Sequence, residues 1–99
     1  VFIFFDLPTE TKKQRKAAAD FRKYLLLDGF TMFQYSIYVR HCASRENMQV
    51  HIDRVIPHIP DTGKVCIIQL TDRQFSDIRI FEGTEAAIPH NTSFQLELF

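Results

Sequence analysis

The chain opens with a run of five apolar residues, Val1 to Phe5, followed by Asp6, Leu7 and Pro8. An apolar run of this length, closed by a turn signal, is typical of a buried strand. Pro8 has no N–H to donate to a sheet and holds the preceding residue extended, so we expect the strand to end here. The pattern therefore predicts a buried N-terminal strand with a carboxylate, Asp6, at its end.

Residues 10–28 have helical periodicity, with Thr9 as the expected N-cap and Gly29 as the expected left-handed stop. At about 100° per residue, one side of this helix is apolar and the opposite half-turn is basic. The apolar side chains are Ala17, Ala18, Phe21, Tyr24 and Leu25, and the basic ones are Lys12, Lys13, Arg15, Lys16, Arg22 and Lys23.

The following stretch, residues 30–42, is rich in aromatic and β-branched residues, which favour strands. Within it, Phe33, Tyr35, Ile37 and Val39 alternate with mostly polar neighbours. One long strand and a hairpin both fit this alternation. We predict a hairpin that bends near residues 34–36, because a compact domain accommodates it better than a long ribbon.

A second helix is predicted over residues 45–58, capped by Ser44. Its inner face is formed by Met48, Ile52, Val55, Ile56 and Ile59, which recur at helical spacing. Beyond a turn at 59–64, the apolar run 65–70 predicts a central strand.

The remaining segments are short. We predict a single helical turn over 73–77, a short strand over 78–83, a loop, and a half-buried terminal strand over 94–99. The terminal strand needs a sheet edge, its own or a neighbour's, and its candidate partner-binding side chains are Phe94, Leu96, Leu98 and Phe99.

The order of these elements is that of an α+β, ferredoxin-like βαββαβ fold. Such a fold is an antiparallel sheet with two helices on one face, here with extra C-terminal strands. We assign residues 1–82 to the ferredoxin-like domain and residues 83–99 to a C-terminal extension.

Charge is distributed unevenly along the 99 residues, although 12 basic and 12 acidic side chains cancel overall. Residues 1–50 hold eight Lys and Arg against five Asp and Glu, and residues 51–99 hold four against seven, so the halves carry +3 and −3. A polyanionic partner would favour the first half. Two Cys, 24 positions apart and without a C-x-x-C pair, favour a reduced, cytoplasmic setting, and no apolar span predicts a membrane segment.

Asp6 has two interpretations. It can serve as an anion near the N-terminus of the following helix, where backbone N–H groups are free. Alternatively it can bind Mg²⁺ for phosphodiester hydrolysis, which usually needs one or two carboxylates. A two-fold dimer would bring the same residue from each subunit to the symmetry axis, and two facing carboxylates would need a cation or a shared proton between them.

The basic helix face is either a solvated surface or a phosphate-contacting surface. Few acidic residues on the same helix can pair with it, which favours phosphate contact, and Arg40 can extend the surface. The aromatic residues of 30–38 are assigned mainly to the core, because the RNA-recognition octapeptide is absent. The histidines lack a carboxylate or Cys at ligand spacing and are interpreted as surface or half-buried residues.

Three stretches together resemble the CRISPR-associated protein 2 family, the small subunit of the spacer-acquisition complex. They are the strand that ends in Asp6-Leu7-Pro8, the helix end "FRKYLLLDGF" and the segment "QYSIYVR". The terminal "SFQLELF" is similar to that of members that accompany a type II effector.

This resemblance implies a ferredoxin-like homodimer that lies between two dimers of the integrase subunit and bridges a short DNA duplex. It also implies a metal-dependent endonuclease on RNA or DNA, with Asp6 as the residue that binds Mg²⁺ across the dimer axis. Lys12, Arg15, Lys16, Arg22, Lys23 and Arg40 correspond loosely to a DNA-contacting surface, and residues 94–99 to a strand that pairs with the partner or the sister subunit.

Three hypotheses stay open on sequence grounds. The first, which we favour, is a DNA-binding scaffold that positions prespacer DNA. The second is a Mg²⁺-dependent endoribonuclease or endonuclease. The third is a small-molecule regulatory domain of ferredoxin-like type, in which the basic helix face is only solvated.

Overall fold

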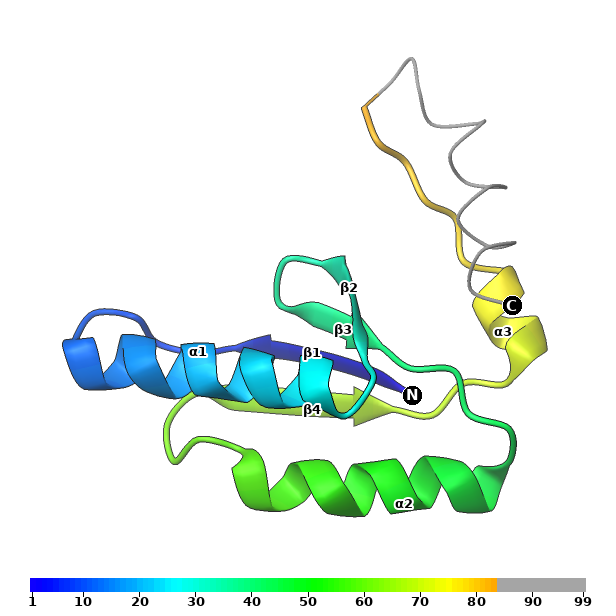
Figure 1. Cartoon of the computed structure of the whole chain (residues 1–99). Coiled ribbons are helices and arrows are strands. Elements are labelled where there is room, and N and C mark those ends of the chain that lie inside the picture. Colours follow the sequence, from blue (N-terminus) through cyan, green and yellow to red (C-terminus); the bar gives the residue numbers. More distant parts are fainter. Residues whose placement is uncertain (84–99) are drawn as a thin grey trace. The chain divides into compact units, whose positions relative to one another are not determined.

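The computed structural model describes residues 1–83, which fall into two compact units, Val1–Gln69 and a second unit that begins at Leu70. Figure 1 shows the sheet and the two long helices of the first unit. The predicted division between residues 1–82 and 83–99 stays a prediction.

The first unit contains an antiparallel sheet with the strand order β2-β3-β1-β4. Its strands are β1 (Phe2–Asp6), β2 (Thr31–Gln34), β3 (Ile37–Val39) and β4 (Lys64–Ile68). With one helix between β1 and β2 and another between β3 and β4, this is the predicted ferredoxin-like arrangement.

β1 is one of the two inner strands and pairs with β3 on one side and β4 on the other, whereas β4 lies at the edge of the sheet that residues 1–83 form. The prediction of a central strand over 65–70 is therefore wrong. The apolar run of β4 has another cause: Val65 and Ile67 pack against the core, while Cys66 and Ile68 alternate onto the opposite face.

The predicted hairpin is confirmed, with Tyr35 and Ser36 forming the turn between β2 and β3. Ser36 has a φ of 66°, a left-handed conformation that closes the turn. The predicted alternation is only partly right, because Tyr38 is buried while Tyr35 is exposed at the turn.

The first helix, α1, spans Lys12–Leu27 and is capped by Thr11 instead of Thr9. The Thr11 side chain accepts a hydrogen bond from the backbone N–H of Gln14, whose own side chain accepts from the backbone N–H of Thr11, which completes a capping box. As predicted, Gly29 follows the helix with a left-handed φ of 95°.

The second helix, α2, spans Arg45–Val55 and begins at the predicted cap, Ser44. A 3₁₀ turn, Ile56–His58, replaces the last turn of the predicted helix. Pro57 explains the change, because proline has no N–H with which to continue the α-helical hydrogen-bond ladder.

The core lies between the two helices and one face of the sheet. Ile3 and Phe5 of β1 are buried against Phe21 of α1 and Val55 of α2, and the Phe5 and Phe21 rings meet edge to face at 5.1 Å. The intervening residues of β1 point to the opposite face, where Phe4 is 37% exposed. Both helices therefore cover one face of the sheet, as predicted.

The second unit contains α3 (Asp72–Ser76), which confirms the predicted helical turn and begins with a capping box formed by Thr71 and Gln74. Residues 78–83 form no strand, so that prediction is wrong. Ile78 and Ile80 are half-buried and alternate with the exposed Arg79 and Phe81, so the apolar spacing reflects one covered side of the segment without regular strand structure. The predicted strand over 94–99 lies outside the described residues.

Candidate functional site

Asp6 is the last residue of β1 and lies on the face of the sheet that the helices leave uncovered. Its backbone position is fixed by the ladder to β4, in which Asp6 is opposite Lys64. Gly63 allows a close approach, since a Cβ at that position would lie 2.8 Å from the Asp6 carbonyl oxygen. The side chain is exposed and comes from an inner strand of the sheet.

Capping of α1 does not explain Asp6. The side chains of Thr11 and Gln14 form the cap, and the Gln14 side chain also accepts a hydrogen bond from the backbone N–H of Glu10. Asp6 precedes the first helical residue by six positions, outside the first turn where a helix N-terminus attracts anions.

A shallow hollow of about 310 Å³ adjoins Asp6. It lies where β1 ends, β4 begins and the β2–β3 hairpin turns, so three separate segments meet at one end of the sheet. The lining residues are Phe4, Phe5, Asp6, Tyr35, Ser36, Ile37, Lys64 and Cys66. The lining is mainly apolar, and Asp6 and Lys64 are its charged members.

One protomer does not provide a complete metal cage. Within residues 1–83, no group of three or more His, Cys, Asp or Glu side chains is placed to hold a metal ion. Asp6 alone fits the way Mg²⁺ is often bound in proteins, by one or two carboxylates together with water and substrate phosphates. A site of that kind would need a second chain or the nucleic acid itself.

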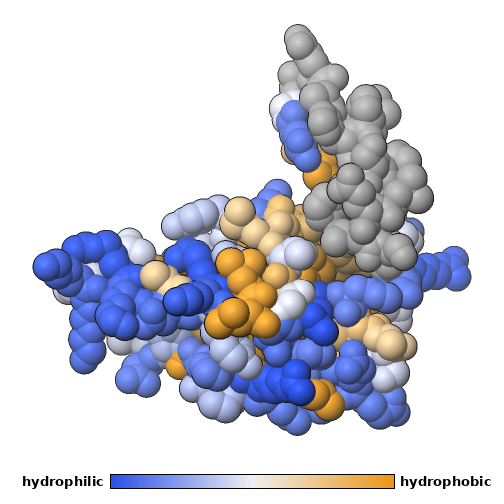
Figure 2. Space-filling view, in the orientation of Figure 1, coloured by the Kyte–Doolittle hydropathy of each residue, from blue (hydrophilic) through white to orange (hydrophobic). Residues whose placement is uncertain are grey.

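The basic side chains of α1 divide into two groups. Lys12, Lys16 and Lys23 lie within about 40° of each other around the helix axis, opposite the buried side. All three are exposed. Figure 2 shows that the surface over the N-terminal half of α1 is hydrophilic.

Two of the exposed basic side chains of α1, Lys16 and Arg15, make contacts within their own part of the chain. Lys16 forms an ion pair of 2.8 Å with Asp20, whose hydrogen bond and charge raise the pKa of the lysine ammonium. Arg15 donates to the backbone carbonyls of Thr9 and Glu10, which positions its guanidinium at the start of α1.

Arg22 belongs to the second group, because its side chain is half-buried. It donates to the Ser36 hydroxyl at 3.1 Å, and its guanidinium lies over the rings of Phe5 and Tyr35. Arg22 thereby connects α1 to the β2–β3 turn and to the end of β1.

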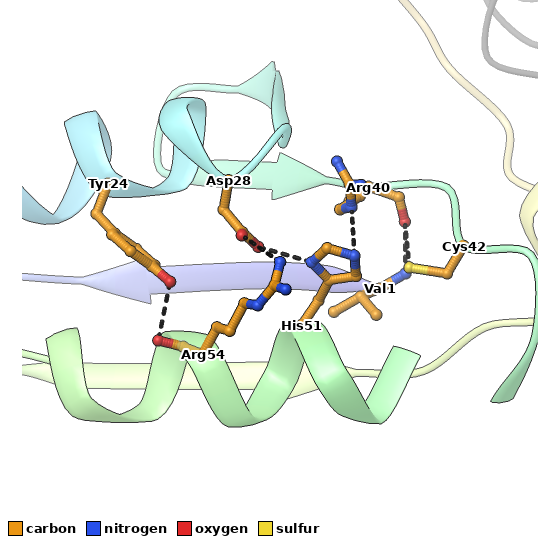
Figure 3. A network of polar contacts seen from close by, with 7 residues as sticks. All are labelled: Val1, Tyr24, Asp28, Arg40, Cys42, His51 and Arg54. Carbon is orange, nitrogen blue, oxygen red and sulfur yellow. Dashed lines mark hydrogen bonds and ion pairs between the residues drawn. The ribbon is translucent and has the colours of Figure 1, made fainter. Parts of the chain in front are cut away.

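Arg40 is likewise held inside the fold (Figure 3). Its Nε–H donates to Nε2 of His51 at 3.0 Å, and Nδ1 of His51 lies 2.8 Å from a carboxylate oxygen of Asp28. An arginine Nε–H can only donate, so Nε2 of His51 accepts and the ring proton is on Nδ1, directed at Asp28. The result is a relay of Arg40, His51 and Asp28 that connects three separate segments.

The relay continues along α2. Arg54 donates to the other carboxylate oxygen of Asp28 at 3.4 Å, and the Tyr24 hydroxyl donates to the Arg54 carbonyl oxygen at 3.0 Å. Burial, followed by the negative charge of Asp28, raises the pKa of Tyr24. The Tyr24 ring also stacks on His58 with a centroid distance of 3.6 Å.

Sequence reasoning missed this network, although one signal was present. Asp28 is the C-cap of α1, where the helix dipole disfavours a negative charge. An acid in that position indicates a tertiary partner, and the buried His51 supplies it, with an exposed fraction of only 4%. The predicted interpretation of the histidines as surface or half-buried residues is therefore wrong for His51.

The four predicted partner-binding residues, Phe94, Leu96, Leu98 and Phe99, lie outside the described residues. No helix within residues 1–83 has the length and apolar character needed to cross a membrane.

Leu26 and Leu27 are exposed at the end of α1, where Figure 2 shows an apolar area.

Comparisons with known proteins agree with this arrangement. The sequence model of CRISPR associated protein Cas2 matches residues 1–78. The chain is 52% identical over 99 residues to a CRISPR-associated endoribonuclease Cas2 of Flavobacterium psychrophilum, with all of this chain and 86% of that protein covered. It is 50% identical to the protein of that name from Parvibaculum lavamentivorans, covering 98% of it, and 40% identical to one from Rhodospirillum rubrum, covering 92%.

Proposed function

This chain belongs to the Cas2 family of CRISPR-associated proteins, and from that membership we propose that it is a homodimeric nucleic-acid-binding subunit of the CRISPR adaptation complex. In this role it bridges dimers of the integrase subunit and holds prespacer DNA, a short duplex, for integration. The observation that carries the proposal is the row of exposed lysines on α1.

The geometry of the row suits a phosphate backbone. Lys12 and Lys23 are separated by 11 residues, or about 17 Å along the helix axis, which matches the axial rise of about five base pairs. Lys16 lies between them, and its pairing with the exposed Asp20 is easily exchanged for a phosphate. Contacts of this kind position a duplex without reading its sequence.

The uncovered face of the sheet supports the homodimer. Phe4 and Ile68 are 37% and 40% exposed there, and both lie on the side that neither helix covers. Apolar side chains of two such faces can pack together as stacked sheets do. A two-fold axis near the ends of the β1 strands would bring two Asp6 carboxylates together and align two α1 helices on one duplex.

Duplex binding measured against salt concentration tests the proposal. Each lysine that contacts a phosphate contributes about −0.9 to the slope of log K against log salt, so replacing Lys12, Lys16 and Lys23 by Gln should reduce the slope by about 2.7 for each protomer in contact. The matched control replaces Arg45, Arg73 and Arg79 by Gln. These three residues are exposed and lie outside α1, so the control changes net charge equally.

Equal loss of binding in both triple variants would show that net charge alone determines binding and would contradict a specific contact between the α1 lysines and the duplex. A flat salt response in the unmodified protein would contradict nucleic-acid binding itself. That outcome would favour the small-molecule regulatory domain, for which the basic helix face needs no partner.

A second candidate function is Mg²⁺-dependent cleavage of RNA or DNA, and the exposed Asp6 beside the hollow is the observation that favours it. The name of these relatives, CRISPR-associated endoribonuclease, points the same way. Asp6 of each protomer would hold the ion, with phosphate oxygens and water as further ligands. When bound, Mg²⁺ would stabilise negative charge on the phosphoryl oxygens and make a bound water more acidic.

Asp6→Asn is the sharpest test of cleavage, because it removes the charge and keeps the size. We expect single-stranded RNA or duplex DNA to be cut by the unmodified protein with added Mg²⁺ and to stay intact with Asp6→Asn. Asp61→Asn, at an exposed turn position, is the matched control. Cleavage by Asp6→Asn at the unmodified rate would exclude this residue as the metal ligand, and light scattering checks that both variants stay dimeric.

A cytoplasmic location for this function is part of the proposal, and the two cysteines fit it. Cys42 and Cys66 are both free thiols, and Cys42 is buried. Unpaired cysteines are typical of proteins kept in a reducing compartment.

A further inference from the structure

Lys64 is the one charged neighbour of Asp6 on the uncovered face of the sheet that the proposed functions do not use. The two residues are opposite each other in the antiparallel ladder between β1 and β4. Residues in such a register point to the same face of a sheet, with Cβ atoms about 4.5–5.5 Å apart. Both side chains are exposed, and neither forms an ion pair or a side-chain hydrogen bond within residues 1–83. Both charges are therefore available to a second chain.

The surroundings of this pair are mainly apolar. Phe4, Ile37 and Cys66 line the hollow beside it. Asp6 and Lys64 are the charged residues of the lining, one acid and one base. In the two-fold arrangement proposed above, the linings of both copies meet, and the two carboxylates and two ammonium groups have no net charge. Charges enclosed by apolar surface need partners, because burial removes the water that would otherwise solvate them.

The backbone places Lys64 within reach of two carboxylates. Gly63 lets the start of β4 pack directly on the end of β1, since a Cβ there would lie 2.8 Å from the Asp6 carbonyl oxygen. Neighbouring strands are about 4.8 Å apart, and the lysine ammonium is carried on a flexible four-carbon stem. When two Asp6 side chains lie near the axis, each Lys64 is therefore beside both of them, and its three N–H donors are sufficient for two carboxylates.

We propose that Lys64 neutralises the paired Asp6 carboxylates at the axis of the homodimer, with each ammonium bridging the carboxylate of its own chain and that of the second copy. The inference rests on the proposed homodimer and names a cation that the chain itself supplies. Two facing carboxylates repel each other unless a cation or a proton lies between them. With Lys64 in that place the dimer forms without Mg²⁺, and Mg²⁺ competes with Lys64 for the same carboxylates.

Dimer dissociation constants, measured by analytical ultracentrifugation in EDTA and in Mg²⁺, test this role. Lys64→Gln removes the charge, and Lys64→Arg keeps it. Lys13→Gln is the matched control, because Lys13 is an exposed lysine of α1 that does not line the hollow. Far-ultraviolet circular dichroism checks that each variant is folded.

In EDTA we expect Lys64→Gln to raise the dissociation constant at least tenfold, because two carboxylates would then meet without a cation. Lys64→Arg and Lys13→Gln should stay within about threefold of the unmodified protein. Adding Mg²⁺ should strengthen the Lys64→Gln dimer and leave the unmodified dimer unchanged. The double variant Asp6→Asn with Lys64→Gln should dimerise more tightly than Lys64→Gln alone, since the repelling charges are gone.

A charge exchange tests whether the contact crosses the interface. Lys64→Glu has two acids in its lining, and Asp6→Lys has two bases, so each variant alone should be monomeric because like charges meet at the axis. Mixed together, the two variants should form a heterodimer, which native mass spectrometry identifies by its mass.

Equal dissociation constants for Lys64→Gln and Lys13→Gln in EDTA would overturn the role of Lys64 and leave the homodimer standing. An unmodified protein that is monomeric in EDTA and dimeric in Mg²⁺ would overturn it as well, because the metal would then be the neutralising cation. A stable homodimer of Lys64→Glu would place this residue away from the axis and have the same consequence. An unmodified protein that is monomeric under both conditions would overturn the homodimer together with this inference.

Discussion

Removing the carboxylate of Asp28 is the most direct perturbation of the buried relay. In Asp28→Ala, His51 loses the acceptor for its Nδ1–H at 2.8 Å, and Arg54 loses its partner at 3.4 Å. The side chains of Asp28 and His51 are only 8% and 5% exposed, so water cannot easily replace the lost contact. We therefore expect Asp28→Ala to destabilise the fold.

The magnitude follows from three contributions. A hydrogen bond to a charged group contributes about 1.5–3 kcal/mol. The pair with Arg54, whose side chain is 57% exposed, contributes at most about 1 kcal/mol after solvent screening. Removing a negative charge from the C-terminal end of α1 relieves an unfavourable interaction with the helix dipole, which offsets about 0.3–1 kcal/mol of the loss. The expected loss is about 2 kcal/mol, or about 10 °C in Tm for a domain of this size.

Urea denaturation followed by circular dichroism measures this loss, at a single protein concentration because a dimer makes stability concentration-dependent. Asp28→Asn keeps an oxygen acceptor for His51 and should cost about 1 kcal/mol, roughly half as much. Asp53→Ala is the matched control on α2, where Asp53 makes an exposed hydrogen bond with Gln49. If Asp28→Ala costs no more than Asp53→Ala, the relay does not stabilise the fold and the reasoning is refuted.

Three further predictions concern α1 and its surroundings. Thr11→Ala should lower the free energy of unfolding by about 1 kcal/mol through loss of the capping box, whereas Thr9→Ala should change it by less than about 0.5 kcal/mol; equal effects in urea denaturation would contradict the assignment of the cap. Gly29→Ala should lower the free energy of unfolding by at least about 1 kcal/mol, because φ is 95° and the new methyl group would overlap the Arg40 guanidinium. A thermal melt that matches the unmodified protein would contradict this, since it would show that the backbone strain and the overlap are easily relaxed. The pKa of Tyr24 is raised in the fold, so the unfolded chain releases that proton first and stability falls as pH rises above the ordinary tyrosine pKa of about 10. Tyr24→Phe should therefore lose less stability than the unmodified protein between neutral and alkaline pH, and an identical pH profile would contradict the shift.

The parts of the fold that depend on neighbouring residues were predictable from the sequence. The strand that ends at Asp6, the cap at Ser44 and the left-handed Gly29 each follow from a few adjacent positions. The cap of α1 could also have been predicted, since Thr11 has a Gln three residues later, as a capping box requires. Thr9 is followed at that spacing by Lys12.

Features that depend on tertiary contacts were not predictable. His51 lies 23 positions from Asp28 and 11 from Arg40, and no spacing rule connects them. Arg22 has helical spacing compatible with the basic face, but the β2–β3 hairpin folds against it and half-buries it. The sequence therefore predicted six basic residues on one surface, and the structure places Arg22 elsewhere.

The inner position of β1 has a consequence for dynamics. Hydrogen bonds hold this strand from both sides, and Ile3 is completely buried beneath α1. Segments with these properties open only with the whole domain, so the amide protons of β1 should exchange with solvent among the slowest in the chain. Asp6 is attached to that slowly exchanging strand, and its carboxylate should therefore keep its place through the local fluctuations that loosen helix ends and loops.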